Sequence, residues 1–534
     1  MGFPDYYMCR HQDLQAEGTG KGKTTINLVF ALLFPKYVID IYTSGAVGCR
    51  YILFRARCAG IKKICQFDGW LSRITGAYVR IREAMMGRSI RKDADMTQGS
   101  IWRHLIDFAL PTVVGLLFQQ LYNTVDTLVV GNFVSKEAQA AVGSTGPIIN
   151  TVVGFCAGLA TGASVIISQR YGAHDDDNLQ KSVHTTIAVT FLLSLVATAV
   201  GLLIIQPMLS FMQTPADVWE DARIYLTIYF AGISGILFYN MGSGILRAVG
   251  DSRRPLLFLM LSALLNTVLD LVFVLVFGMG VNGVALATIL AQIISAAAIL
   301  WTLTREKGAY GIRWRELRID RKSLSGILKI GLPSSIQSAI TSFSNVFVQS
   351  YINAFGSACM AGYSIYGKLD SFVLIPVQSL GMASTTMVGQ NWGAGQKQRA
   401  RESVSTAVKM SLVSTLVLGL AAFFAAEQLI GLFSPERDVV SYGVRFIQII
   451  TPFYLMITFN QIYAGALRGI GDATAPTVIM LCSFVVFRQV YLYVTRVMNL
   501  GFVSVALAYP MGWILCSLLL IIRYRRSRLF EARK

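Results

Sequence analysis

The sequence predicts an all-α membrane protein with twelve transmembrane helices, arranged in two six-helix lobes that are related by a parallel repeat. Its composition, the spacing of its apolar runs and an internal repeat support this fold class. Of the 534 residues, 54% are hydrophobic and 14% are charged, and the mean hydropathy is +0.55. Soluble domains carry about 25% charged residues. The composition therefore predicts a polytopic membrane protein.

The net charge of +18 is compatible with nucleic-acid binding, but the distribution of the charge argues against it. The basic residues cluster in short segments between apolar runs, which is typical of loops at a membrane surface. The eight cysteines contain no CxxC pair, so neither a disulfide framework nor a zinc site is expected. No cleavable signal peptide is expected at Met1, because the first strong apolar run is late and is broken by Pro35.

Residues 1–100 are predicted to be a basic N-terminal extension without a convincing span. Within it, Gly18–Thr25 resembles the variant phosphate-binding loop of ATP:corrinoid adenosyltransferases, but Glu17 stands where the usual spacing needs glycine, and no apolar strand precedes it. We therefore expect the extension to be dispensable, with Met96 as a natural beginning of the functional chain, and we do not expect an enzyme.

The hydropathy from Ile101 onwards predicts twelve spans. Six fall in an N-terminal lobe, 101–304, and six in a C-terminal lobe, 327–525; a basic linker, 305–326, joins them and a basic tail, 526–534, follows. The spans are placed at 103–133, 137–168, 182–212, 218–248, 255–279 and 281–304, then at 327–354, 358–390, 402–433, 437–468, 476–499 and 502–525.

The charges of the connections predict the orientation. One set of connections carries Arg170 and Lys181, Arg253 and Arg254, the basic linker and the tail, whereas the alternate connections carry mainly acids. By the positive-inside rule, both termini are cytoplasmic. We expect a multi-pass protein of the cell inner (plasma) membrane and a monomer, surrounded by lipid.

An internal repeat relates the two halves. The turn Arg247–Pro255, with the pattern Arg-x-x-Gly-Asp, returns 221 positions later as Arg468–Pro476, and the same shift maps Gln169 onto Gln390. Because each half holds six spans, the two copies have the same orientation. Two parallel six-helix bundles around a cavity are typical of secondary transporters.

Asn266 and Asp270 lie within one apolar run, four residues apart, and so project from the same helical face. A carboxylate near the middle of a membrane helix costs roughly 2.5–3.5 kcal/mol on insertion scales. Such a residue indicates a water-filled cavity or a bound cation; the alternative is a structural Asp that a neighbouring helix satisfies.

These features together resemble the MATE family (multidrug and toxic compound extrusion) over about residues 101–525. The resemblance rests on an ordered set of motifs: Leu110-Pro111, Asn123-Thr-Val-Asp126, the two Arg-x-x-Gly-Asp turns, Asn266-Thr-Val-Leu-Asp270 and Val388-Gly-Gln-Asn-Trp-Gly-Ala394. It implies an antiporter that exports lipophilic organic cations and drugs in exchange for H⁺ or Na⁺, without a further cofactor.

The resemblance also implies coupling-ion roles for Asp126, Asp270 and Asn266, with Gln119 and Thr288 as neighbours and Asn240 as a further candidate. Asp126 shares a helical face with Gln119 and Tyr122. No metal site is expected beyond a Na⁺ held between Asp126 and Asp270. For Gln119, Asn240 and Thr288, hydrogen bonding between helices is the alternative.

The second half departs from the family pattern, because the seventh span carries Thr341–Asn345 where many members have an acid. Ion coupling is therefore expected in the N-terminal lobe, where the ionisable residues deep within the predicted spans are acids. Asp370 is the remaining deep acid of the second half, and Lys368 suggests a local charge pair for it.

Aromatic residues within the spans are predicted to form cavity walls that bind flat cations by stacking and cation–π attraction. The substrate-cavity candidates are Tyr122, Tyr239, Phe343, Phe347 and Tyr366. The alternative function is a flippase for lipid-linked oligosaccharides. Such a protein is expected to place cationic residues in its cavity for the pyrophosphate, and Arg488 is the one feature that favours it.

Overall fold

The computed structural model describes residues 95–134, 136–212 and 214–531, and every regular element among them is a helix. This confirms the predicted fold class. The predictions for residues 1–94, including the Gly18–Thr25 loop, lie outside the described residues.

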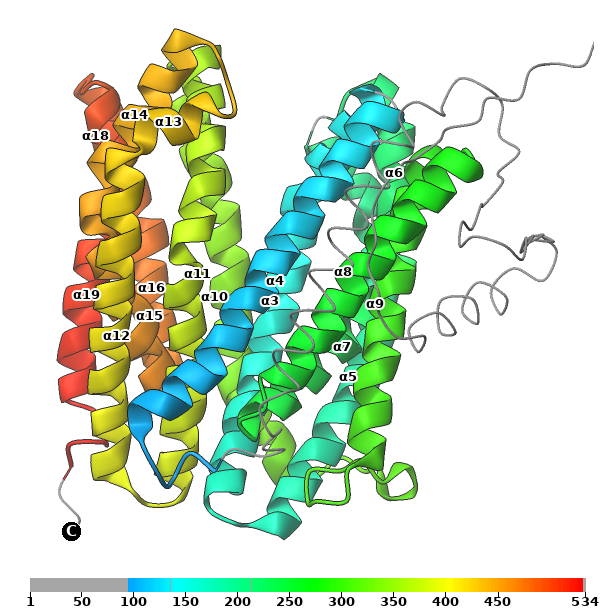
Figure 1. Ribbon diagram of the computed structural model, residues 1–534, viewed down its shortest axis with the longest axis vertical. Coiled ribbons are helices and arrows are strands. Elements are labelled where there is room, and N and C mark those ends of the chain that lie inside the picture. The colour runs from blue at the N-terminus through cyan, green and yellow to red at the C-terminus, as the bar shows by residue number, and fades with distance from the viewer. Residues whose placement is uncertain (1–94, 135, 213, 532–534) are drawn as a thin grey trace, which may run out of the picture. The chain divides into compact units, whose positions relative to one another are not determined.

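Among the described residues, the first half contains seven α-helices, which Figure 1 shows in blue to green. They are α3 (Ile101–Phe133), α4 (Lys136–Gly172), α5 (Asp176–Phe211), α6 (Ala216–Ala231), α7 (Ile233–Ala248), α8 (Arg253–Leu271) with the π-helical turn η1 (Val272–Val276), and α9 (Gly280–Arg305).

The second half follows a linker that contains the short 3₁₀ turn η2 (Trp314–Glu316). Its elements are α10 (Arg321–Asn353), α11 (Ser357–Gly393), α12 (Lys397–Phe424), α13 (Ala426–Gly431), α14 (Arg437–Ile450), η3 (Thr451–Phe453), α15 (Tyr454–Gly469), α16 (Thr474–Leu481), η4 (Cys482–Phe487), α17 (Arg488–Val497), α18 (Phe502–Ala506) and α19 (Ala508–Arg525).

Within the described residues, ten helical segments are long and apolar enough to cross a membrane, and α6 with α7, bent by 48°, forms an eleventh. Helix α10 is more polar and falls outside that set, but it is 33 residues long and packs along α4. With α10, the described segments correspond to the twelve predicted spans. The bend between α6 and α7 lies at Gly232, inside the predicted span 218–248.

Local sequence explains the first helix of each half. Pro111 in α3 and Pro333 in α10 each remove one backbone N–H donor from the helix. Next to each proline, a hydroxyl bonds a carbonyl one turn earlier: Thr112 Oγ1 to Phe108 O at 2.9 Å, and Ser334 Oγ to Ile330 O at 2.9 Å. These hydroxyl bonds are additional to the helical ladder, since the carbonyl that Pro111 leaves without a helical donor is Asp107 O, to which Ser252 Oγ donates at 3.5 Å. Both helices continue through the proline.

The first helix of each lobe packs partly against the other lobe. Leu105 and Phe108 of α3 belong to a hydrophobic cluster with Met387 and Leu467 of the second half. Helix α10 in turn packs against α4 and α5 of the first half. Gly162 permits the close approach of α4 and α10, because a Cβ there would lie 2.5 Å from the backbone nitrogen of Gly331.

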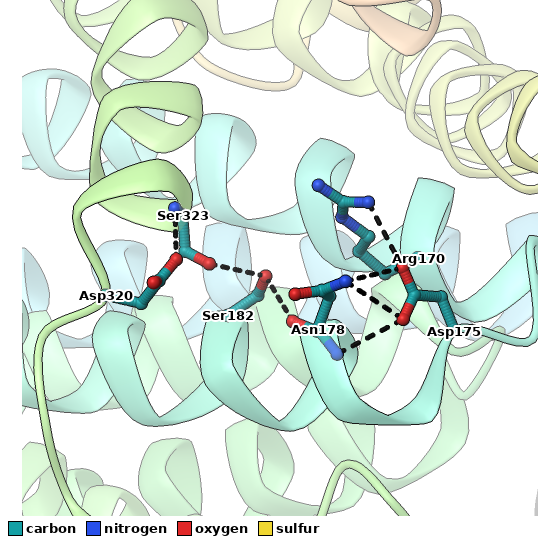
Figure 2. Close-up of polar contacts among 6 residues, drawn as sticks. All are labelled: Arg170, Asp175, Asn178, Ser182, Asp320 and Ser323. Carbon is teal, nitrogen blue, oxygen red and sulfur yellow. Dashed lines mark hydrogen bonds and ion pairs between the residues drawn. The ribbon is translucent and has the colours of Figure 1, made fainter.

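Hydrogen bonds at the turn after α4 order the start of α5, and the start of α10 meets it there (Figure 2). Asp175 caps α5 by accepting from the Asn178 backbone at 3.3 Å. Hydrogen bonds from the Asn178 side chain, at 3.1 and 2.8 Å, and from its backbone lower the pKa of the Asp175 carboxyl. Asp320 caps α10 through the Ser323 backbone at 2.8 Å, which lowers its pKa as well. The hydroxyls of Ser182 and Ser323 lie 3.2 Å apart and join the two helix starts.

Candidate functional site

A cavity of about 550 Å³ lies between the lobes. Residues of α3, α4, α6, α7, α8 and α9 form its wall on the side of the first half, and residues of α11 and α15 form it on the side of the second half. Its volume falls within the range of about 300–1,000 Å³ that is usual for small-molecule sites.

The structure brings five of the six predicted coupling residues to one region. Gln119, Asn240 and Thr288 line the cavity. Asn266 Nδ2 donates to Thr288 Oγ1 at 3.3 Å, and Asp270 lies one turn further along α8, fully buried. The π-helical turn η1 begins two residues after Asp270, and such turns are frequent at functional sites. The buried carboxylate thus lies behind a polar part of the cavity wall.

The side chains of Asp126, Tyr122 and Phe343 lie outside the described residues. The backbone of the first two belongs to α3, which packs against α8 and so against the helix of Asp270. Their predicted roles stay predictions.

The aromatic wall differs in part from the predicted set. Tyr239 lines the cavity, and its hydroxyl donates to Pro255 O at 3.2 Å. Tyr225 and Tyr229, absent from the sequence-based set, also line it, with stacked rings 6.5 Å apart. Phe347 is 49% exposed and is not among the described lining residues.

Tyr366 lies instead in a polar cluster of the second lobe. Its hydroxyl donates to Asp370 Oδ1 at 3.1 Å. The suggested pair of Asp370 with Lys368 is wrong for the described residues, because the Lys368 ammonium lies over the ring of Phe433, 5.9 Å from its centre. Arg488 donates to Asn345 Oδ1 at 2.9 Å and does not line the cavity.

Two arginines of the repeated turns line the cavity. Arg247 ends α7 and Arg468 ends α15, at positions that the shift of 221 residues relates. The expectation that only acids are deep in the first half is therefore wrong, because Arg247 turns into the cavity. The turn motif itself was visible in the sequence, but the direction of its first side chain depends on how α7 is rotated against α4 and α9.

Reciprocal hydrogen bonds join the lobes at the end of the bundle that carries these turns, here called the basic end. Gln169 Nε2 of α4 donates to Gly469 O of α15 at 2.8 Å. Gln390 Nε2 of α11 donates to Ala248 O of α7 at 2.9 Å. The shift of 221 residues exchanges both donors and both acceptors, so the two contacts form a symmetric pair. We call Gln169 and Gln390 the glutamine pair.

Two glycines make this approach possible. A Cβ at Gly172 would lie 2.0 Å from Gln390 O, and one at Gly393 would lie 1.9 Å from Gln169 O. Neither position can hold a larger side chain without separating the backbones of α4 and α11. The basic end is therefore closed by direct backbone contact between the lobes.

The residues before α3 add a third contact there. Met96 is buried, its backbone N–H donates to Gln390 Oε1 at 2.9 Å, and its carbonyl accepts from Asn391 Nδ2 at 3.2 Å. Arg399 also donates to the Met96 carbonyl, at 3.2 Å. The start of the first lobe is thus held by the second.

At the turn after α7, Asp251 accepts hydrogen bonds from the backbone N–H groups of Arg253 and Arg254, at 3.0 and 3.1 Å, and forms an ion pair with Arg254. Burial raises the pKa of the Asp251 carboxyl, and the Arg254 charge opposes that shift. The equivalent Asp472 accepts from the backbone of Ala475 and is ion-paired with Arg523. Both acids of the repeated turns therefore cap the next helix.

Comparison with known proteins shows matches over both halves. The MatE family model matches residues 111–272 and 333–494. The probable multidrug resistance protein YpnP of Bacillus subtilis (strain 168) is 30% identical over 437 residues, covering 82% of this chain and 98% of that protein.

More distant proteins also match. A protein of Shewanella oneidensis named FAD transporter is 24% identical over 391 residues, covering 72% of this chain and 86% of its own length. The structure of a MOP superfamily transporter from Pyrococcus furiosus superposes with a TM-score of 0.77 at 24% identity, covering 82% of this chain and 98% of that one.

Proposed function

The chain belongs to the MATE family, and on that premise we propose that it is a secondary multidrug efflux transporter of the membrane, an antiporter that exports lipophilic organic cations in exchange for H⁺ or Na⁺. Several relatives are named as multidrug resistance or export proteins. We propose small organic molecules as its substrates and no enzymatic activity.

The observation that carries this proposal is the cavity between the lobes with the fully buried Asp270 behind its polar wall. An intramembrane carboxylate is costly and is usually retained for ion or substrate binding. Thr288 connects the two features, because it lines the cavity and accepts from Asn266 on the helix of Asp270.

Alternating access needs a group whose charge differs between the two states, since an ion that binds both states equally drives nothing. We propose Asp270 and Asp126 as that group, with Asn266 and Thr288 supplying amide and hydroxyl oxygens to a bound Na⁺. Binding of H⁺ or Na⁺ neutralises the acids and releases a cationic drug, and loss of the ion restores drug affinity.

The proposed orientation places the basic end, with both termini, in the cytoplasm of a cell with this protein in its inner membrane. In that orientation the glutamine pair closes the cytoplasmic side. The two lobes, the linker 305–326 and the tail 526–534 are proposed as the functional units, and the part of the N-terminal extension before Met96 as dispensable.

The flippase alternative is weakened by the family membership, although the cavity does hold arginines, the residue type that such a function requires. Within an efflux transporter, cavity arginines can bind an anionic group of the substrate instead.

The proposal is tested with purified protein in liposomes loaded with ethidium or norfloxacin, imposing a Na⁺ gradient and a pH gradient separately. Asp270→Asn should abolish gradient-driven efflux while the protein stays folded, and Asp126→Asn should abolish or strongly weaken it. Asp370→Asn should be milder, because Asp370 is not among the described cavity residues and an amide can still accept from Tyr366. Efflux at the wild-type rate from Asp270→Asn, with Asp370→Asn inactive, places coupling in the other lobe and refutes the mechanism.

A further inference from the structure

The charged side chains on the described part of the cavity wall are both cations. Arg247 and Arg468 line it, and no Asp or Glu is among the described lining residues. They come from opposite lobes, at the ends of α7 and α15. A cavity for purely cationic substrates gains nothing from two guanidinium groups, because like charges repel.

Neither guanidinium is neutralised by the part of the protein that the structure describes. Arg468 Nη2 donates to the neutral Gln337 Oε1 at 2.8 Å, and its Nε is buried without a hydrogen-bond partner among those residues. Arg247 has no ion pair with a described carboxylate. The neighbouring Asp251 and Asp472 are already paired, with Arg254 and Arg523.

A purely structural role does not account for this burial. A cation in the last turn of a helix interacts favourably with the helix dipole, but the gain is small compared with the cost of removing an unpaired charge from water. A ligand that supplies the missing negative charge offsets that cost, and guanidinium groups match the planar geometry of carboxylate and phosphate.

The position of the two arginines is fixed by the glutamine pair. Ala248, directly after Arg247, accepts from Gln390 of the second lobe, and Gly469, directly after Arg468, accepts from Gln169 of the first. The arginines therefore flank the interface between the lobes at the closed basic end of the cavity.

We propose that Arg247 and Arg468 form an anion subsite that binds the carboxylate or phosphate group of an amphiphilic substrate. This inference rests on the proposed efflux function and specifies its substrate class: lipophilic cations that also carry an anionic group, that is, zwitterions. The remainder of the substrate lies against the wall formed by Tyr225, Tyr229 and Tyr239.

The subsite has a consequence for transport. Because one arginine belongs to each lobe, the pair is complete only while the basic end is closed. An anionic group that contacts both arginines therefore binds the closed state more tightly and shifts the lobes toward it. Substrate binding from the basic side then promotes closure behind the substrate.

The test uses two dyes that differ in one group. Rhodamine 110 carries a free carboxylate, and rhodamine 123 is its methyl ester. Equilibrium binding of each dye to the full-length protein is measured by fluorescence anisotropy in phosphatidylcholine nanodiscs, without any ion gradient. Wild-type protein should bind rhodamine 110 more tightly than rhodamine 123.

Arg247→Gln and Arg468→Gln should each weaken rhodamine 110 binding by roughly 10- to 100-fold, as expected for one charge-assisted hydrogen bond. Binding of rhodamine 123 should change by less than about threefold, because the ester makes no such bond. Arg247→Lys should restore part of the difference. Arg526→Gln is the matched control: it removes an exposed charge at the same end that does not line the cavity, and it should leave the binding of both dyes unchanged.

If Arg247→Gln and Arg468→Gln weaken the binding of both dyes equally, the arginines have a structural role and the subsite is overturned. Tighter binding of rhodamine 123 to the wild-type protein also overturns it, a result that does not depend on the folding of any variant. Nanodiscs with phosphatidylglycerol distinguish the source of the anion, since displacement of rhodamine 110 by that lipid would assign the subsite to a lipid headgroup. Gradient-driven rhodamine 123 efflux is scored separately, so failure of the efflux function is distinguishable from failure of the subsite.

Discussion

Replacing Gln390 by alanine measures how much the closed basic end depends on its side-chain amide. Gln390 is fully buried, donates to Ala248 O at 2.9 Å and accepts from Met96 N at 2.9 Å. A net loss of about 0.5–1.5 kcal/mol for each bond is expected, and more where a buried carbonyl is left without a partner. The closed state should therefore lose roughly 2–3 kcal/mol relative to an open state in which water satisfies these groups.

A loss of that size shifts the equilibrium between closed and open states by roughly 30- to 150-fold, since about 1.4 kcal/mol corresponds to a factor of ten. Gln169→Ala removes the hydrogen bond to Gly469 O from a half-buried side chain. Its effect should be smaller, about fivefold for roughly 1 kcal/mol. Replacing the whole glutamine pair should give at least the larger of the two shifts.

The assay is the distance between spin labels at Asp177→Cys and Gln398→Cys, measured by double electron–electron resonance in a background without the native cysteines. Both positions are exposed at the basic end and are related by the shift of 221 residues. The unsubstituted background should show mainly the short distance, and Gln390→Ala should populate a longer one. Gln349→Ala is the matched control, because its amide bonds Asn353 within α10 alone.

An unchanged distance distribution after replacing both members of the glutamine pair would show that their amides do not hold the basic end closed. In that case the backbone contacts between α4 and α11, rather than the amides, hold the basic end closed. A shift of equal size in the Gln349→Ala control would show that the labels report general loosening of the protein.

Three further predictions concern the same end of the molecule. Gly172→Ala should favour the open state more strongly than Gln390→Ala or Gln169→Ala, because the new Cβ would lie 2.0 Å from Gln390 O. The distance between the same two spin labels checks this prediction. A chain shortened to begin at Met96 should insert and export drugs normally. A chain that begins at Ile101 should export poorly, because it lacks the contacts that Met96 makes with the second lobe. Loss of export by the chain that begins at Met96, at normal expression, would show that the extension is required. Asp320→Ala should destabilise the start of α10 by about 1 kcal/mol at pH 7. Because the folded-state pKa of Asp320 is lowered, its contribution is present above the unfolded pKa of about 3.9 and is lost as the pH falls through the folded value; a thermal-melting difference that persists unchanged at low pH would contradict this.

The sequence by itself determined the fold class. Membrane insertion selects long apolar helices whose backbone bonds are satisfied internally, so hydropathy alone locates such segments. The bend at Gly232 and the polar α10 were compatible with this pattern, although α10 is less apolar than the other long helices. The repeat also identified equivalent residues in the two halves, including Gln169 and Gln390 and the two Arg-x-x-Gly-Asp turns.

Parts of the candidate site followed from helical spacing. Asn266 and Asp270 share a face because they are four residues apart. In the structure Asn266 donates to Thr288 on the neighbouring α9, and Asp270 is fully buried one turn further along α8. The spacing did not identify Tyr225 and Tyr229 as cavity residues, because a single helix does not reveal which of its apolar faces meets lipid.

Only the tertiary structure decided which equivalent residues meet across the lobes. The sequence related Gln169 to Gln390, but their acceptors, Gly469 and Ala248, each lie on the opposite lobe. Pairing of this kind depends on the rotation and approach of two rigid helix bundles, which local propensity does not encode. The same approach brings Arg247 and Arg468, from the last turns of α7 and α15, to the wall of one cavity, because the direction of a side chain at a helix end is set by the packing of that helix and not by its neighbours in the chain.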